Sequence, residues 1–122
     1  MTTIDNSKIF LDGVYADVSL YVPASTTYVE GTVLGRDADD NLTAFTSTTA
    51  GSEPLYILAQ DVTNSDTSET TVDFVRALDF GTVDADKLTF INSDDASDVD
   101  VLDAMKKNGF KLANVQQLIR NI

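Results

Sequence analysis

The chain has no cysteine and no histidine among its 122 residues. The absence of cysteine excludes disulfides, thiolate nucleophiles and thiolate metal sites. The absence of histidine excludes serine triads, cysteine–histidine pairs and most zinc sites, because each of them needs an imidazole. We therefore expect that the protein is not an enzyme and has no catalytic residue, no cofactor and no metal. An enzyme that works with carboxylates alone is the disfavoured alternative.

Basic residues are also scarce, because 8 lysines and arginines stand against 20 aspartates and glutamates and leave a net charge of -12. Such a chain lacks the basic face that binds a nucleic-acid backbone or an anionic membrane. No apolar run approaches the roughly 18 residues of a membrane span. Residues 1–10 lack the basic-then-apolar order of a signal peptide. We expect no nucleic-acid partner, no membrane, and a protein that stays where it is made.

The length fits one domain, and the hydrophobic content of 43% fits a globular fold. Residues 1–13 show neither a helical nor a strand period and end at the turn signal Asp12-Gly13. We predict that they form a flexible arm that orders against a partner, and that residues 14–122 form a single domain. The arm carries four scattered apolar residues, Ile4, Ile9, Phe10 and Leu11.

Several short runs predict strands. Val14–Val22 alternates apolar and polar residues, the pattern of a half-buried strand, and Pro23 ends it because proline has no N–H for a sheet ladder. Further strands are predicted at Val29–Leu34 with Gly31 as a bulge, Leu42–Phe45, Leu55–Ala59, Thr70–Leu78 and, more weakly, Lys87–Ile91. The first two of these should pair as a hairpin, and Val72, Phe74 and Arg76 should share one side of their strand.

A helix is predicted after Ser97, because Asp98 and Asp100 place negative charge at its positive end. Its apolar face should consist of Val99, Leu102 and Met105, with Lys106 and Lys107 in the last turn and Asn108-Gly109 as the C-terminal cap. An extended stretch at Phe110–Ala113 precedes a short final helix that Asn114 would cap and that carries Val115, Leu118 and Ile119. The fold class is α+β, mostly β.

Two clusters of acidic residues are candidates for metal binding. Residues 37–41 resemble the opening of a calcium loop, but Leu42 and Thr48 stand where that motif needs glycine and glutamate, so a solvated turn is favoured. Asp94, Asp95, Asp98, Asp100 and Asp103 cluster around the predicted helix start. Helix capping on a solvated face is favoured over weak binding of a divalent ion. Gly31 and Gly35 do not make a phosphate loop.

Four tyrosines are candidate contact residues, because the tyrosine ring is apolar and its hydroxyl is polar. They are Tyr15, Tyr21, Tyr28 and Tyr56. They could pack between subunits or stack on sugars, and ordinary half-buried strand positions are an equally good interpretation.

Three motifs follow one another between Tyr28 and Val75. They are Glu30-Gly31-Thr32-Val33-Leu34-Gly35, then Leu42-Thr43-Ala44-Phe45 after a polar turn, and then, after a Thr/Ala/Gly loop, Leu55-Tyr56-Ile57-Leu58-Ala59-Gln60-Asp61-Val62. This ordered set resembles the head decoration proteins of tailed phages, the lambda protein D type. Members of that family often read G-x-x-L-G, a hairpin that ends on an aromatic residue, a loop, and G-I-L-A-x-D-V.

The resemblance implies a compact small β-barrel or β-tulip-like domain with a short C-terminal helical part and an extended N-terminal arm. It implies a structural virion protein, made in the host cytoplasm, that binds as a homotrimer to the outer surface of the expanded head at three-fold positions. There the trimer would clamp the major capsid protein against internal DNA pressure, and the arm would extend a capsid strand. The alternative is a small β module on the virion that binds glycan or a host surface.

Overall fold

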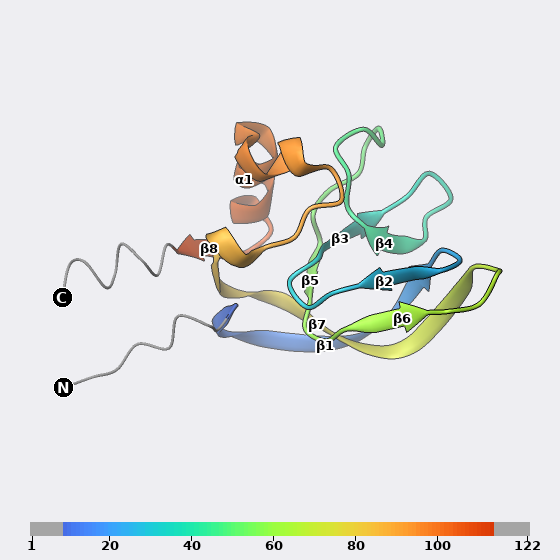
Figure 1. Cartoon of the computed structure of the whole chain (residues 1–122). Coiled ribbons are helices and arrows are strands. Elements are labelled where there is room, and N and C mark those ends of the chain that lie inside the picture. Colours follow the sequence, from blue (N-terminus) through green and yellow to red (C-terminus); the bar gives the residue numbers. More distant parts are fainter. Residues whose placement is uncertain (1–8, 114–122) are drawn as a thin grey trace.

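The structure is a computed structural model and describes residues 9–113. Its main sheet has the strand order β1-β7-β5-β3-β4, and β8 pairs with the end of β7 (Figure 1). The β7–β8 pairing is parallel and the others in this sheet are antiparallel. The six strands are β1 Phe10–Val22, β3 Val33–Arg36, β4 Leu42–Ala44, β5 Tyr56–Leu58, β7 Thr70–Asp84 and β8 Phe110–Ala113.

A smaller sheet pairs β2 (Thr26–Tyr28) with β6 (Val62–Asn64). Two 3-10 turns, η1 (Ala85–Lys87) and η2 (Ser93–Ser97), precede the helix α1 (Val99–Lys107). Across residues 9–113, no helix is long and apolar enough to cross a membrane. The prediction of a mostly β domain is confirmed.

The main sheet carries a small core on each of its two faces. Successive residues of a strand point to opposite faces, and both members of the central pairs Val33/Leu34 and Ile57/Leu58 are fully buried. The first core contains Leu20, Val22, Tyr28, Leu34, Leu42, Ala44, Leu58, Val62, Val75 and Ala77. The second contains Val33, Phe45, Ile57, Leu78, Val83, Val101, Met105 and Phe110. The β2–β6 ribbon therefore covers one face of the sheet, and α1 covers the other.

The small β-barrel or β-tulip-like domain that the resemblance implies is not a closed barrel, because the main sheet is open. β1 and β4 are its two edge strands, and no ladder joins them among the described residues, although part of β1 lies beside β4. Closure requires strands long enough to tilt and stagger around an axis. With three residues, β4 is too short to supply that pairing.

The long β1–β7 pair interrupts the simple alternation that the sequence predicts. Its register shifts at three places, between Phe10 and Asp12, Val14 and Tyr15, and Val18 and Leu20. Each shift sets an extra residue of one strand against the partner strand. Val14 is 48% exposed, whereas its neighbour Tyr15, which points to the opposite face of the sheet, packs against the second core.

The third shift places Phe74 outside the sheet. Val18 pairs with Val75 and Leu20 with Val72, so β7 holds one more residue than β1 between these pairs. Phe74 takes a φ of 59°, in the left-handed region. The expectation that Phe74 lies on the same side as Val72 is wrong, because Val72 packs against the first core and Phe74 is 83% exposed.

Two glycines face each other where β1 crosses the end of β7. Gly13 pairs with Gly81. A Cβ built on Gly81 would lie 2.4 Å from the carbonyl oxygen of Asp12 and 2.5 Å from the Cα of Gly13. The two backbones therefore touch, and no side chain fits between them.

Two other predicted strands differ from the structure. Residues 29–32 form a turn, closed by a hydrogen bond from Thr32 N to Val29 O of 3.1 Å, in which Gly31 has a φ of 96°. Gly31 is therefore a turn residue and not a bulge. Residues 87–91 contribute only an isolated bridge between Thr32 and Thr89.

The β2–β6 ribbon was not predicted from the sequence. The ribbon is fastened to the end of β1 by Asn64, whose Nδ2 donates to the carbonyl oxygens of Val22 at 3.1 Å and Ser68 at 2.9 Å. Because this amide is buried, its hydrogen bonds are needed to offset the loss of water. Residues 70–78 belong to β7 as predicted, and the strand continues to Asp84.

The helix forms where it was predicted, but with a different buried face. Asp98 is its N-cap, and its carboxylate accepts the N–H of Asp100 at 2.9 Å. Val101 and Met105, one turn apart, enter the second core, and Val99 is 67% exposed. The predicted final helix with Asn114, Val115, Leu118 and Ile119 lies outside the described residues.

Candidate interaction surfaces

The predicted arm joins the sheet before its expected end at residue 13, because β1 begins at Phe10. The carbonyl oxygen of Ile9 accepts the N–H of Asp84 at 2.8 Å, and Phe10 pairs with Val83. Ile9 and Phe10 are half-buried against this chain, and Leu11 is 36% exposed. Ile4 lies outside the described residues.

Tyr15 is held by its own domain. Its ring meets the edge of Phe10 at a centroid distance of 6.0 Å, and the guanidinium carbon of Arg76 lies 4.1 Å from the centre of the ring. Such a cation–π contact adds about 0.5–1 kcal/mol at an exposed site. These contacts hold Tyr15 at the edge of the second core, so its ring is already in contact with Phe10 and Arg76 of its own chain.

Tyr28 is part of the first core, and Tyr56 packs against it. Tyr28 is 7% exposed, and its hydroxyl shares a hydrogen bond of 3.0 Å with the hydroxyl of Thr43. Tyr56 pairs with Leu34 and is half-buried. Because Tyr15 lies at the other core, the four tyrosines do not form one continuous surface.

Tyr21 is half-buried near several carboxylates. Desolvation raises the pKa of its hydroxyl above the ordinary value, and the negative charges of Glu69, Asp37 and Asp39 raise it further. This part of the surface, at the tips of two turns, therefore has a negative potential.

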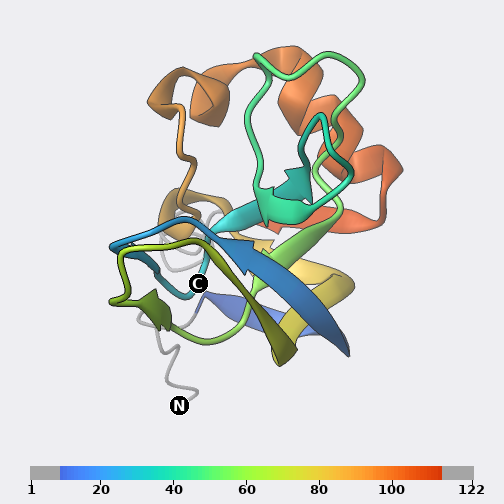
Figure 2. The same cartoon turned by 90° about the vertical axis from the view of Figure 1, so that its right-hand side faces the viewer.

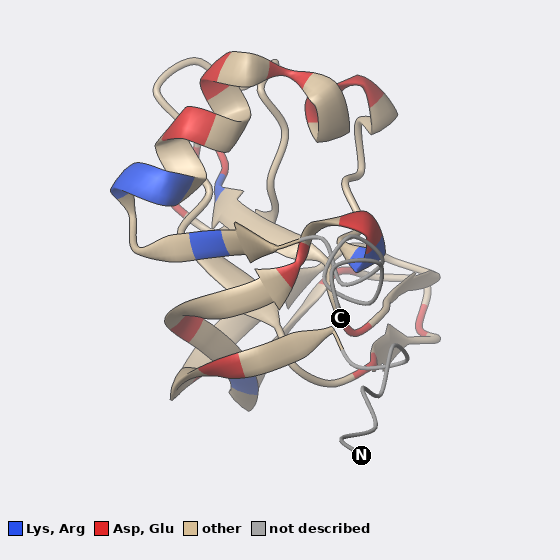
Figure 3. Ribbon diagram, turned by 90° about the vertical axis from the view of Figure 1, so that its left-hand side faces the viewer, with Lys and Arg blue, Asp and Glu red and all other residues tan. Residues whose placement is uncertain are grey.

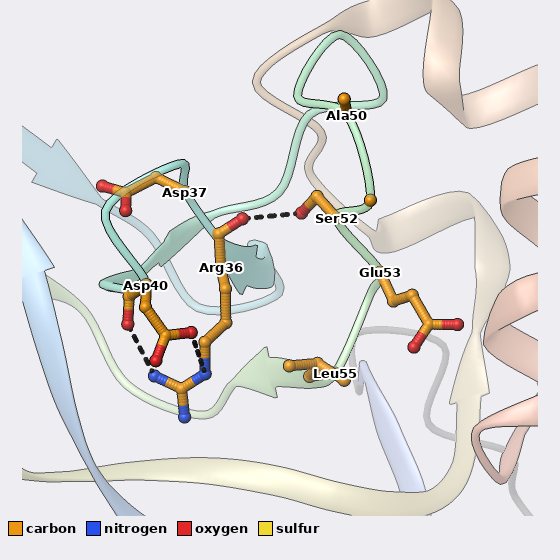
Figure 4. A pocket seen from close by; sticks show the side chains of 8 residues that line it. Arg36, Asp37, Asp40, Ala50, Ser52, Glu53 and Leu55 are labelled. Carbon is orange, nitrogen blue, oxygen red and sulfur yellow. Dashed lines mark hydrogen bonds and ion pairs between the residues drawn. The ribbon is translucent and has the colours of Figure 1, made fainter.

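The calcium-like residues 37–41 form a self-contained turn. One carboxylate oxygen of Asp37 accepts the N–H groups of Asp39 and Asn41, each at 2.9 Å. The turn borders a polar pocket in which the Nε of Arg36 lies 3.8 Å from a carboxylate oxygen of Asp40 (Figure 4). The hydroxyl of Ser52 donates to the carbonyl oxygen of Arg36 at 2.8 Å. The favoured solvated turn agrees with these contacts.

Two residues of the acidic cluster, Asp95 and Asp98, make hydrogen bonds that stabilise the fold. Asp95 is 1% exposed, and its carboxylate accepts both the N–H of Ser47, at 3.0 Å, and the hydroxyl of Ser47. It ties η2 to the loop of residues 45–55, which rises beside α1 (Figure 2). Asp98 caps α1. Among residues 9–113, no three acidic side chains are arranged to hold a metal ion.

The charges are distributed unevenly along the fold. Acidic residues lie in η2 and the first turns of α1, whereas lysines lie at the end of α1 and in β8 (Figure 3). Since acids outnumber bases over most of the chain, like-charged copies repel each other at most orientations.

Among residues 9–113, one exposed large apolar residue, Leu11, was a candidate contact residue from the sequence. The others were not predicted as contact residues, and they are Phe74, Val99, Val14, Val29, Phe80 and Ile91. Val14 and Phe80 are direct neighbours across β1 and β7. No sequence signal marks these positions, because their exposure follows from bulges and from contacts between distant segments.

One hollow of the surface is lined without any charged side chain. It has a volume of about 260 Å³ and lies between β2, the start of β3 and residues 89–91. Its walls include Thr27, Val29, Ala44, Thr89 and Ile91, and Val29 and Ile91 are 43% and 61% exposed. We call it the uncharged hollow. Its lining combines apolar side chains with uncharged hydroxyl groups.

These features define a small β protein whose surface is suited to contact with other proteins. A family model described as bacteriophage lambda head decoration protein D matches residues 4–109. The chain belongs to this family, so it is a structural decoration protein of a phage capsid, located in the virion on the outer surface of the head. The comparison with curated proteins found no match, and neither did the comparison with solved structures.

Proposed function

We propose that this chain is a cement protein: three copies bind the expanded head at its three-fold positions and stabilise it against internal DNA pressure. The partner is the major capsid protein. Capsid decoration follows from the family, and the trimer, the three-fold position and the resistance to pressure are the proposal.

The observation that supports it most is the free edge of β1. One edge of this strand pairs with β7 from Phe10 to Val22, and within residues 9–113 the other edge has no strand partner. Unpaired N–H and C=O groups along an edge bind an added strand, as in peptide recognition by strand addition. The arm runs directly into this strand, so an ordered arm would begin from a fixed position.

The energies favour several arms over one. Each main-chain hydrogen bond contributes about 0.5–1.5 kcal/mol net, and ordering each residue costs about 1–2 kcal/mol. One arm therefore binds weakly. Three arms on one trimer raise the avidity by about 10²–10⁴-fold, which suits a protein that must occupy many equivalent sites late in assembly.

The test is a deletion of residues 2–8, which leaves the pairing of Phe10 with Val83 intact. The deleted segment contains Asp5 and Lys8 and no other charged residue, so the net charge stays at -12. We expect a folded trimer whose affinity for expanded heads falls by about 10²–10⁴-fold, the contribution of three linked arms. Binding can be measured by co-sedimentation with heads that lack the decoration protein.

A point variant sharpens this test. Ile4→Ser removes the first apolar side chain of the arm, and Thr3→Ser is the matched control at the neighbouring position. We expect weaker head binding only for Ile4→Ser. Wild-type affinity in the deletion variant would rule out the role of the arm, and a monomeric wild-type protein in sedimentation would rule out the trimer.

A further inference from the structure

We propose that copies of this chain associate head to tail, with Phe74 of one copy seated in the uncharged hollow of the next. The inference rests on the trimer of the proposed function and names the two surfaces that meet in it. A closed ring of three identical copies needs two different patches on each copy, because each neighbour meets a different one.

The hollow has the size and chemistry of an anchor site. Its volume of about 260 Å³ falls below the roughly 300–1,000 Å³ of pockets for drug-sized ligands. Val29 and Ile91 present apolar surface at its rim, and the hydroxyls of Thr27 and Thr89 are small and uncharged. An aromatic side chain in such a pocket is the usual centre of a protein interface.

A second copy as the occupant requires a contact that limits repulsion. Two copies that each carry a net charge of -12 approach most easily where the surfaces that meet carry few carboxylates. The polar pocket beside Arg36 is bordered by Asp37, Asp40 and Glu53. The groove between residues 45–54 and α1 is bordered by Asp98 and Asp100. The uncharged hollow carries no such obstacle.

Phe74 has the properties of the matching anchor. Of the large hydrophobic side chains in residues 9–113, it is the most exposed, at 83%. It does not line the hollow of its own chain. It projects from the bulge of β7 opposite Ser19, whose hydroxyl donates to Asp73 at 2.7 Å. The neighbouring carboxylate is thereby engaged within the chain.

The backbone of Phe74 gives an independent indication. Its φ of 59° is costly for a bulky residue, and asparagine or glycine would adopt it more easily. Strain of this kind persists mostly where the side chain has a function. The bulge accounts for the left-handed backbone at this position, but it does not require an exposed phenylalanine there.

Cross-linking tests the proposed contact directly. The wild-type chain has no cysteine, so Phe74→Cys and Ile91→Cys in one chain introduce the only two thiols. A short bismaleimide should then join three copies into a closed covalent ring, because each contact brings together one thiol of each kind. The double variant Phe74→Cys/Val99→Cys is the control, since Val99 is as exposed as Ile91 but lies on α1. Failure to obtain covalent trimers, or equal yields in the control, overturns the inference.

Single substitutions test the energetics. Ile91→Lys lowers the net negative charge by one, so a loss of association cannot come from added repulsion; Val99→Lys is the matched control. We expect the dissociation constant of the trimer to rise at least about 30-fold for Ile91→Lys, as for a hot-spot residue, and to stay unchanged for Val99→Lys.

Phe74→Gly separates the anchor from a structural role. Glycine removes the strain and the anchor together, so we expect loss of the trimer together with a resistance to urea equal to or above that of monomeric Ile91→Lys. Reduced resistance would assign Phe74 to the fold and overturn the inference. Variants that stay trimeric but lose head binding would assign these residues to the capsid and overturn it as well. The arm deletion tests head binding separately, so the two proposals can fail independently.

Discussion

Replacing Gly81 by alanine should push the backbones of β1 and β7 apart where Gly13 faces Gly81. Gly81 has a φ of 151°, in a region that is nearly exclusive to glycine and costs other residues about 1–3 kcal/mol. Its new Cβ would also lie 2.4 Å from the Asp12 carbonyl oxygen and 2.5 Å from the Cα of Gly13. Both obstacles are backbone atoms, so a further overpacking cost of about 1–3 kcal/mol is expected.

The expected total is a loss of about 2–6 kcal/mol in the free energy of unfolding, measured by urea denaturation. Gly51→Ala is the matched control, because Gly51 has a φ of 76° and an added Cβ there meets nothing within 4 Å. It should cost about 1–2 kcal/mol, the backbone strain alone. In addition, amide exchange at residues 10–13 should accelerate in Gly81→Ala only. A loss no greater than that of Gly51→Ala would refute the close backbone contact.

Three further predictions concern other contacts. Asp95→Ala should lower the free energy of unfolding by about 2–4 kcal/mol, because Ser47 loses a charged acceptor, and Asp95→Asn should lose less; equal stability of all three proteins in urea would contradict this. Raising salt from about 0.05 M to about 0.5 M should strengthen the trimer by screening repulsion between copies, and weakening in sedimentation would count against it. The raised pKa of Tyr21 should fall toward its ordinary value in Glu69→Gln, as followed by ultraviolet titration. Because the pKa of Tyr21 is higher in the folded than in the unfolded protein, the free energy of unfolding should decrease as pH rises from the unfolded to the folded pKa. An unchanged titration curve would exclude Glu69 as a cause.

Local patterns predicted the elements whose structure is determined by neighbours in sequence. The hairpin of β3 and β4, the buried strand β5 and the helix α1 follow from apolar runs, turn residues and the Asp98 cap. The orientation of Val14, Tyr15 and Phe74 could not be predicted, because each register shift depends on the partner strand. The β2–β6 ribbon is equally non-local, since its attachment depends on a hydrogen bond between Asn64 and Val22, which lie 42 residues apart in the sequence.

The candidate contact residues show the same limit. The sequence marked tyrosines as interface candidates from their chemistry, and the structure uses Tyr28 in a core and Tyr15 against Arg76. The uncharged hollow is assembled from three separate segments, so no short motif could reveal it. The resemblance to the family came from the order of motifs between Tyr28 and Val75, which depends on the fold and not on any contact surface, and the family model confirms it over residues 4–109.

The direct passage from the arm into β1 determines how the molecule carries tension. A force applied at Phe10 along the strand direction would act on β1 while it is hydrogen-bonded to β7 from Phe10 to Val22. Such a load stretches those bonds together, in shear, instead of unzipping them one by one. We expect an arm bound to the capsid to detach from the capsid before β1 separates from β7.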